Sequence, residues 1–176
     1  VALSDDRLVL TGGYDAGTAM LQVKPEGNAF SVKKLWHQET CGSHMHMPIV
    51  LDGFLYENTR ENHHDKGMVC IALDTGEIKW STKGGKNARR FERGPLLAVD
   101  GMILNLSDVT GVLCLIKPTP EGYKELAAAR VLEGNNLWAC MAFSQGKLLV
   151  RSLTRMKCLD LRPSEPTKKN PEPSPK

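Results

Sequence analysis

Short apolar segments separated by polar turns recur along most of the chain. Apolar runs of this length, bounded by turn residues, are typical of β-strands, and in the clearest unit they predict strands at residues 48–51, 54–57, 68–73 and 77–81. Gly53 lies in an Asp-Gly turn between the first two segments, and Thr75-Gly76 separates the last two. Asp-Gly readily adopts the positive φ angles of a two-residue hairpin turn. The unit is therefore predicted to be a four-stranded antiparallel sheet.

Two registers show that this unit repeats. Three cysteines, each within an apolar strand-like run, are spaced 44 residues apart: Cys70, Cys114 and Cys158. Three glycines, spaced 48 and 45 residues apart, each end a polar turn before an apolar run: Gly53, Gly101 and Gly146. A period of about 40 to 50 residues with four strands is typical of β-propeller blades, because one sheet cannot bury both of its faces until another stacks on it. We interpret the cysteines as small apolar residues that face the next blade.

The predicted fold class is all-β: a partial β-propeller of about four blade-like, four-stranded antiparallel sheets over residues 1–162. The repeats run approximately over residues 1–37, 38–83, 84–132 and 133–162. The alanines of Lys124–Arg130 favour helix locally, but the repeat register places this stretch as an outer strand. Residues 163–176 are rich in Pro and polar residues, a composition that predicts a disordered tail.

Composition and charge exclude several function classes. The net charge of +3 on 176 residues is small and evenly mixed, which argues against a nucleic-acid footprint or a polybasic membrane patch. No apolar run approaches the roughly 18 residues that a transmembrane helix needs. No signal peptide is evident at the start of the chain, and five cysteines without a C-x-x-C pair argue against a zinc site and a regular disulfide framework.

The segment from Cys70 to Trp80 is similar to the repeat end A-x-D-x-x-T-G-x-x-x-W of the pyrroloquinoline-quinone-like β-propeller repeat proteins. Thr75 and Gly76 match the turn of that motif, and Ala72 departs from it at the Asp position. The third repeat lacks the Trp. The chain thus resembles this family, which includes the outer-membrane-protein assembly propeller and related secreted bacterial propellers. The resemblance implies a C-terminal fragment of a seven- or eight-bladed ring, and a periplasmic or secreted location.

The resemblance leaves two functions open. The first, which we favour, is a non-enzymatic scaffold or binding module that engages a protein, peptide or glycan and has no cofactor. The alternative is a fragment of a dehydrogenase that holds pyrroloquinoline quinone and calcium on the propeller axis. Family members with that activity are said to use a vicinal cysteine pair, and no two cysteines are adjacent in this chain.

The repeat register also indicates where binding would occur. The connections between successive blades, residues 38–47, 84–94 and 133–140, are equivalent and should gather on one face near the central channel. Loops on a rigid scaffold are frequent binding sites, and Arg and Trp are common interface anchors. The candidate binding residues in these loops are His44, His46, Arg89, Arg90, Arg93 and Trp138.

No catalytic residue or metal site is predicted. A zinc site needs three or four converging ligands, and the histidines are interpreted as solvated loop residues: His37, His44, His46, His63 and His64. Trp80 is expected to be largely buried between adjacent blades, because the turn at Thr75-Gly76 leads into its strand.

Overall fold

The computed structural model describes residues 1–61, 64–83 and 89–163. It is all-β, with four antiparallel sheets and no helix within those ranges. The first sheet contains β1 (Arg7–Gly12), β2 (Gly17–Glu26) and β3 (Ala29–Gln38). The second contains β4 (Ile49–Leu51), β5 (Phe54–Glu61), β6 (His64–Ala72) and β7 (Ile78–Ser81). The third contains β8 (Leu96–Val99), β9 (Met102–Leu106), β10 (Val112–Lys117) and β11 (Lys124–Arg130). The fourth contains β12 (Ala142–Ser144), β13 (Lys147–Arg151) and β14 (Met156–Asp160).

The expectation of four strands in every sheet is met only in the second and third sheets. In the first sheet the innermost strand is reduced to a single bridge between Ala2 and Leu8. The fourth sheet ends at β14, so no outer strand follows within the described residues. The stretch Lys124–Arg130 is strand β11 and not helix, as the repeat register predicted. The predicted tail lies almost wholly outside the described residues, which end at residue 163.

Each inner hairpin turns through two residues with positive φ. Asp52 and Gly53 have φ angles of 49° and 79°, and Asp100 and Gly101 have 48° and 69°. Gln145 and Gly146 repeat the geometry with 51° and 75°. Two consecutive positive φ angles define the hairpin turn whose twist matches that of the flanking strands. The turn glycines therefore set the pairing register of the three hairpins.

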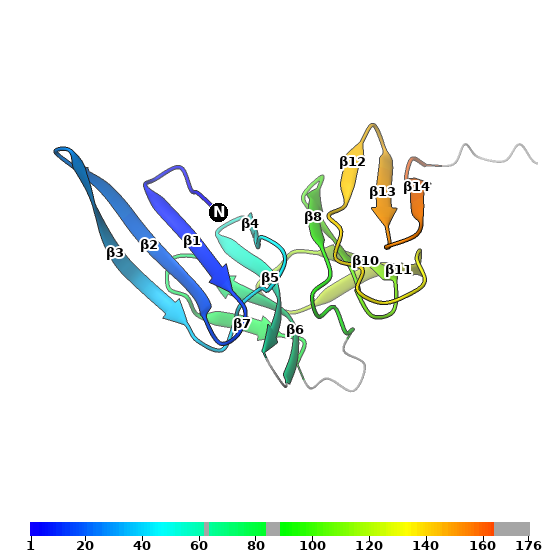
Figure 1. Ribbon diagram of the computed structural model, residues 1–176, viewed down its shortest axis with the longest axis horizontal. Helices are drawn as coiled ribbons and strands as arrows, with labels where there is room; N and C mark the ends of the chain where they lie inside the picture. Colours follow the sequence, from blue (N-terminus) through cyan, green and yellow to red (C-terminus); the bar gives the residue numbers. More distant parts are fainter. Residues whose placement is uncertain (62–63, 84–88, 164–176) are drawn as a thin grey trace, which may run out of the picture.

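The sheets stack in chain order, and each pair of neighbours encloses one apolar cluster. Val9 and Met20 of the first sheet pack with Leu55, Val69 and Ile71 of the second. A second cluster joins the second and third sheets, and a third cluster joins the third and fourth. Figure 1 shows the resulting series, from β1–β3 at one end to β12–β14 at the other.

Residues along the second strand of each sheet alternate between the two neighbouring sheets. The second residue after the turn glycine faces the preceding sheet, and all three such residues are fully buried: Leu55, Ile103 and Leu148. The third residue faces the following sheet, as Tyr56 and Leu104 do. At the end of the series its equivalent is Leu149, which is 41% exposed because no sheet within the described residues covers it. The alternation follows from the two-residue period of a β-strand.

The three repeat cysteines lie on equivalent strands of their sheets but not at equivalent pairing positions. They lie on the third strands in chain order of their sheets, β6, β10 and β14. Cys70 pairs with Tyr56 and Cys158 with Leu149, both three residues after a turn glycine, whereas Cys114 pairs with Asn105, four residues after one. A one-residue offset turns a side chain to the other face of a sheet. Cys114 therefore faces back toward the second sheet, and the expectation that all three face the next blade is wrong for it.

Tryptophans on two outer strands dock onto the next sheet. The indole Nε1 of Trp36 donates to the Leu73 carbonyl oxygen at 2.8 Å, and that of Trp80 donates to the Thr119 carbonyl oxygen at 2.7 Å. Each acceptor lies in the turn between the last two strands of the following sheet. Gly76, with φ of 74°, leaves room there, since a Cβ would lie 2.7 Å from the Trp36 ring. Trp80 is mostly covered between the second and third sheets, as expected, although it is not fully buried.

Candidate functional site

The loops that join successive sheets meet at one edge of the stack. The turn between β9 and β10 ties two of them together. The Ser107 hydroxyl donates to the Arg90 carbonyl oxygen at 2.5 Å, and the Leu137 backbone N–H donates to the Asp108 carbonyl oxygen at 3.3 Å. We call this edge the loop face. Its loops are held by hydrogen bonds to buried strand ends, so their side chains have defined positions.

Arg93 and Trp138, predicted from different loops, are in contact. The Arg93 guanidinium carbon lies 5.8 Å from the centroid of the Trp138 ring, a cation–π distance. The Trp138 Nε1–H donates to the Asp108 carboxylate at 2.9 Å, which fixes the ring. Trp138 also lines a small cavity of about 170 Å³ with Arg151. An aromatic ring held at one edge and stacked by a cation is a suitable anchor for a partner.

His46 joins this group, and His44 does not. The His46 Nδ1 lies 4.0 Å from the Cys140 Sγ, and its Nε2 is buried with no hydrogen-bond partner in the part of the chain that the structure describes. Burial lowers the pKa of His46, against a smaller opposing effect of a hydrogen bond to the Arg93 backbone. His44 instead packs against Tyr14, with ring centroids 4.7 Å apart. His63 lies outside the described residues.

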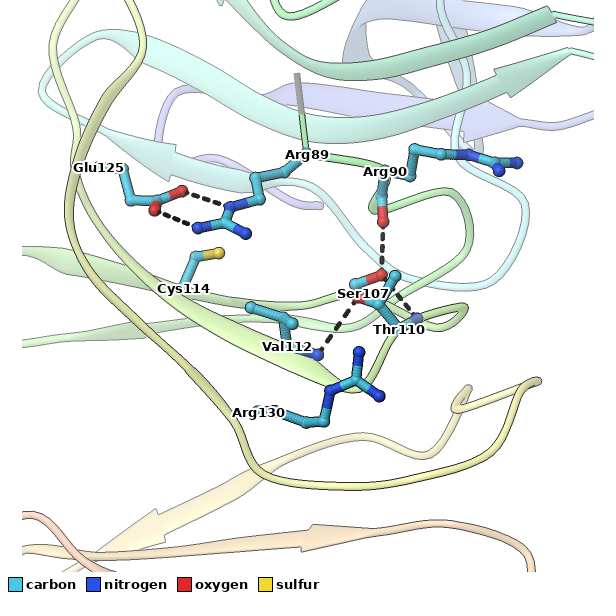
Figure 2. A pocket seen from close by; sticks show the side chains of 8 residues that line it. All are labelled: Arg89, Arg90, Ser107, Thr110, Val112, Cys114, Glu125 and Arg130. Atoms are coloured by element: carbon cyan, nitrogen blue, oxygen red, sulfur yellow. Dashed lines mark hydrogen bonds and ion pairs between the residues drawn. The ribbon is translucent and has the colours of Figure 1, made fainter. Parts of the chain in front are cut away.

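A second feature of the loop face is a pocket of about 670 Å³ beside the third sheet (Figure 2). Arg89 and Arg130 approach it from different sides, while the side chain of Arg90 points away and pairs with Glu92. The remaining lining comes from the β9–β10 turn and from β10 and β11: Ser107, Thr110, Val112, Cys114 and Glu125. Arg90 thus contributes its backbone to the pocket and not its charge.

Arg89 is held rigidly by a carboxylate. Its Nε and Nη2 donate to the two Glu125 oxygens at 3.0 and 2.8 Å, and the Tyr123 hydroxyl donates to Glu125 at 2.9 Å. The hydrogen bonds from Arg89 lower the pKa of Glu125, and those from Glu125 raise the pKa of Arg89. Burial raises the pKa of the nearby Cys114 thiol to about 12. The pocket therefore holds a fixed ion pair and a thiol that stays protonated.

A buried carboxyl lies between the first and second sheets. Glu57 is fully buried on β5, and its hydrogen-bond donors among the described residues are the hydroxyls of Thr18, at 2.8 Å, and Thr11, at 3.0 Å. Burial raises its pKa to about 7, although the two hydroxyls act in the opposite direction. Thr11 also accepts the Ser43 backbone N–H at 2.8 Å, which links the carboxyl to a loop of the loop face.

Sequence reasoning found the loops but missed part of the site. It did not single out Arg130, Glu125 or Glu57. Glu57 could have been noticed, because a charged residue interrupts an apolar strand at a position that the repeat register turns toward the preceding sheet. Arg130 ends a strand whose pairing alone does not show which loop lies beside it. Among the described residues no group of three His, Cys, Asp or Glu could hold a metal ion.

Comparison with known proteins adds no assignment. No protein-family model matches the chain, and a search of curated proteins found no significant relative. The described residues contain no helix long and apolar enough to cross a membrane.

Proposed function

We propose that the chain is part of a β-propeller of the pyrroloquinoline-quinone-like repeat type and works as a non-enzymatic binding module for a protein or peptide partner. The loop face is the proposed contact surface. The observation that carries the proposal is the convergence of Arg93, Trp138 and His46 from three loops that are equivalent in the repeat. A periplasmic or secreted location, as the family resemblance implies, belongs to the same proposal.

The two ends of the stack support the propeller part of the proposal. Leu149 and Met156 of the fourth sheet are 41% and 66% exposed, although their face corresponds to the one that Tyr56 presents to a buried cluster. At the other end, Leu10 of the first sheet is 49% exposed on the face directed away from the second sheet. Apolar faces of this kind become buried when a further sheet of the repeat stacks on them. A ring of sheets would cover both.

A pull-down with matched variants tests the binding part. Trp138→Ala and Arg93→Gln should reduce capture of the partner from an extract of the source organism at least tenfold, since aromatic and Arg anchors carry most interface energy. Lys33→Ala, on β3 and away from the loop face, should leave capture unchanged. Capture that is equal for all three variants would contradict the proposal.

The dehydrogenase alternative has its own test. The chain is incubated with pyrroloquinoline quinone and calcium, and dye reduction is followed with a panel of alcohols and sugars. Turnover at the level of free cofactor is the expected result. Sustained turnover above that level would replace the binding module by the dehydrogenase.

A further inference from the structure

The pocket of Figure 2 combines two guanidinium groups with one carboxylate and an apolar floor. We propose that it binds a carboxylate group of the protein partner, an inference that rests on the proposed binding function. Its size, about 670 Å³, lies within the range of ligand-binding clefts. The pocket lies on the loop face, where Ser107 connects its wall to the Arg90 backbone at 2.5 Å.

Arg89 is positioned to donate to a ligand without moving. A guanidinium carries five N–H donors in a fixed fork, and Glu125 occupies only Nε and one Nη2 hydrogen. Because Glu125 is itself held by the Tyr123 hydroxyl at 2.9 Å, the guanidinium pays little conformational entropy on binding. No described residue accepts a hydrogen bond from Nη1 of Arg89, so this edge is available to a ligand.

Arg130 supplies the charge that the ion pair does not. Within residues 1–61, 64–83 and 89–163 no carboxylate lies within ion-pair distance of its guanidinium. Thr110, beside it in the lining, accepts the Val112 backbone N–H at 3.4 Å, and its hydroxyl hydrogen has no acceptor in the same ranges. An incoming anion would therefore meet one uncompensated guanidinium and one free hydroxyl donor.

The composition of the lining selects among anions. Arg89 and Arg130 together with Glu125 give a net charge of +1, so a second negative charge on the ligand would face Glu125 uncompensated. This disfavours phosphate dianions and polyanions. Val112 and Cys114 form the apolar part of the lining, and none of the described lining residues has an aromatic ring on which a sugar could stack. A single planar carboxylate on an apolar stem fits these conditions, and guanidinium binds carboxylate with two parallel hydrogen bonds.

The test is a chemical-shift titration of the ¹⁵N-labelled full chain. The probes are N-acetylleucinate, which represents a chain-terminal carboxylate, and N-acetylglutamate α-amide, which represents a side-chain carboxylate. N-acetylleucinamide, the neutral analogue of N-acetylleucinate, is the uncharged control. Inorganic phosphate and glucuronate represent the other anion sources. The resonances followed are the side-chain Nε–H of Arg89 and Arg130 and the backbone amide of Val112.

At least one carboxylate probe should shift these resonances saturably, and N-acetylleucinamide should not. Arg130→Gln should weaken the carboxylate affinity at least fivefold, because it leaves the Arg89–Glu125 pair intact. The matched control is Arg155→Gln, an exposed arginine paired with Glu133, which should change the affinity less than twofold.

Equal shifts with the neutral amide, stronger binding of phosphate or glucuronate, or an unchanged affinity in Arg130→Gln would each overturn the proposal. Its failure is separable from failure of the proposed function. If the carboxylate probes do not shift the pocket resonances but capture of the partner still depends on Trp138, only the carboxylate site is refuted. Loss of both removes the binding module as well.

Discussion

The interface between the second and third sheets differs in its side chains from the interface between the third and fourth sheets. The former contains the Trp80 indole, which docks onto the third sheet and which we call an indole clamp, with the rings of Tyr56 and Tyr123 about 6 Å away. It also contains a reciprocal amide pair, in which Asn58 and Asn105 donate to each other at 2.9 and 2.8 Å. The buried residues of the latter are aliphatic apart from Met141, with Phe143 packed against them. Each outer strand of the first three sheets has a β-bulge, and the residue after the bulge is Trp36, Trp80 or Ala127.

One register position shows the difference most directly. The fourth residue after the turn glycine faces the preceding sheet and is Glu57, Asn105 or Val150 in the second, third and fourth sheets. All three are buried. The same backbone position thus accepts a carboxyl, an amide or an isopropyl group, depending on what the neighbouring sheet offers. The backbone repeat sets where sheets meet, and the side chains at each interface decide how specifically they do so.

Removal of an indole clamp should have the largest effect. Trp80→Ala is expected to lower the free energy of unfolding by about 3 kcal/mol, at the low end for Trp→Ala because the ring is only partly buried. Urea denaturation measures it. Leu126→Ala, an exposed residue on β11, is the control and should stay within about 0.5 kcal/mol. A Trp80 variant as stable as the control would erase the contrast between the two interfaces.

The buried carboxyl predicts a pH dependence. Its pKa is raised in the folded state from the ordinary 4.5 to about 7, so the unfolded chain ionises first as pH rises. Folding stability should therefore fall between about pH 4.5 and pH 7 and level off above, by up to about 3 kcal/mol. Glu57→Gln should remove this fall. Urea denaturation midpoints of both proteins at pH 5 and pH 8 measure the effect. If the midpoint falls as much in Glu57→Gln as in the unchanged protein, Glu57 does not cause the pH dependence.

Disruption of the amide pair should have a smaller effect. Asn105→Leu leaves the Asn58 side chain with the Gly94 carbonyl oxygen as its one remaining partner among the described residues, and a buried amide without its partner costs about 2 kcal/mol. Asn58→Leu together with Asn105→Leu removes both polar groups and should recover part of that loss. Urea denaturation of the two single variants and the double variant measures the coupling. Costs that simply add would indicate that the pair is not a unit.

The smallest effect is expected when a tryptophan is introduced at the corresponding position of the third sheet. Ala127→Trp places an indole at the position that corresponds to Trp36 and Trp80, next to the fourth sheet. Burial of part of the ring should stabilise the chain by about 1 kcal/mol. Thermal denaturation against the unchanged protein measures it. Destabilisation would mean that the fourth sheet lacks the receiving turn that the second and third sheets provide.

The sequence predicted the architecture at the level of strands and turns. Hairpin glycines at Gly53, Gly101 and Gly146 and the outer strand Lys124–Arg130 follow from local chemistry and from the period. These features are determined by neighbours in the chain, which a sequence displays. The candidate residues Arg93, Trp138 and His46 could be grouped for the same reason, since equivalent loops of a repeat emerge at the same edge.

By itself, the sequence determined where the hairpins turn and in which order the sheets follow. Only the tertiary structure decided that Cys114 faces the opposite way from Cys70, and that Arg130 lies across a pocket from Arg89. The equal spacing of the cysteines concealed a one-residue change in pairing, which reverses the face of a side chain. Pairing register and the contacts between sheets depend on residues far apart in the chain, so local patterns cannot specify them.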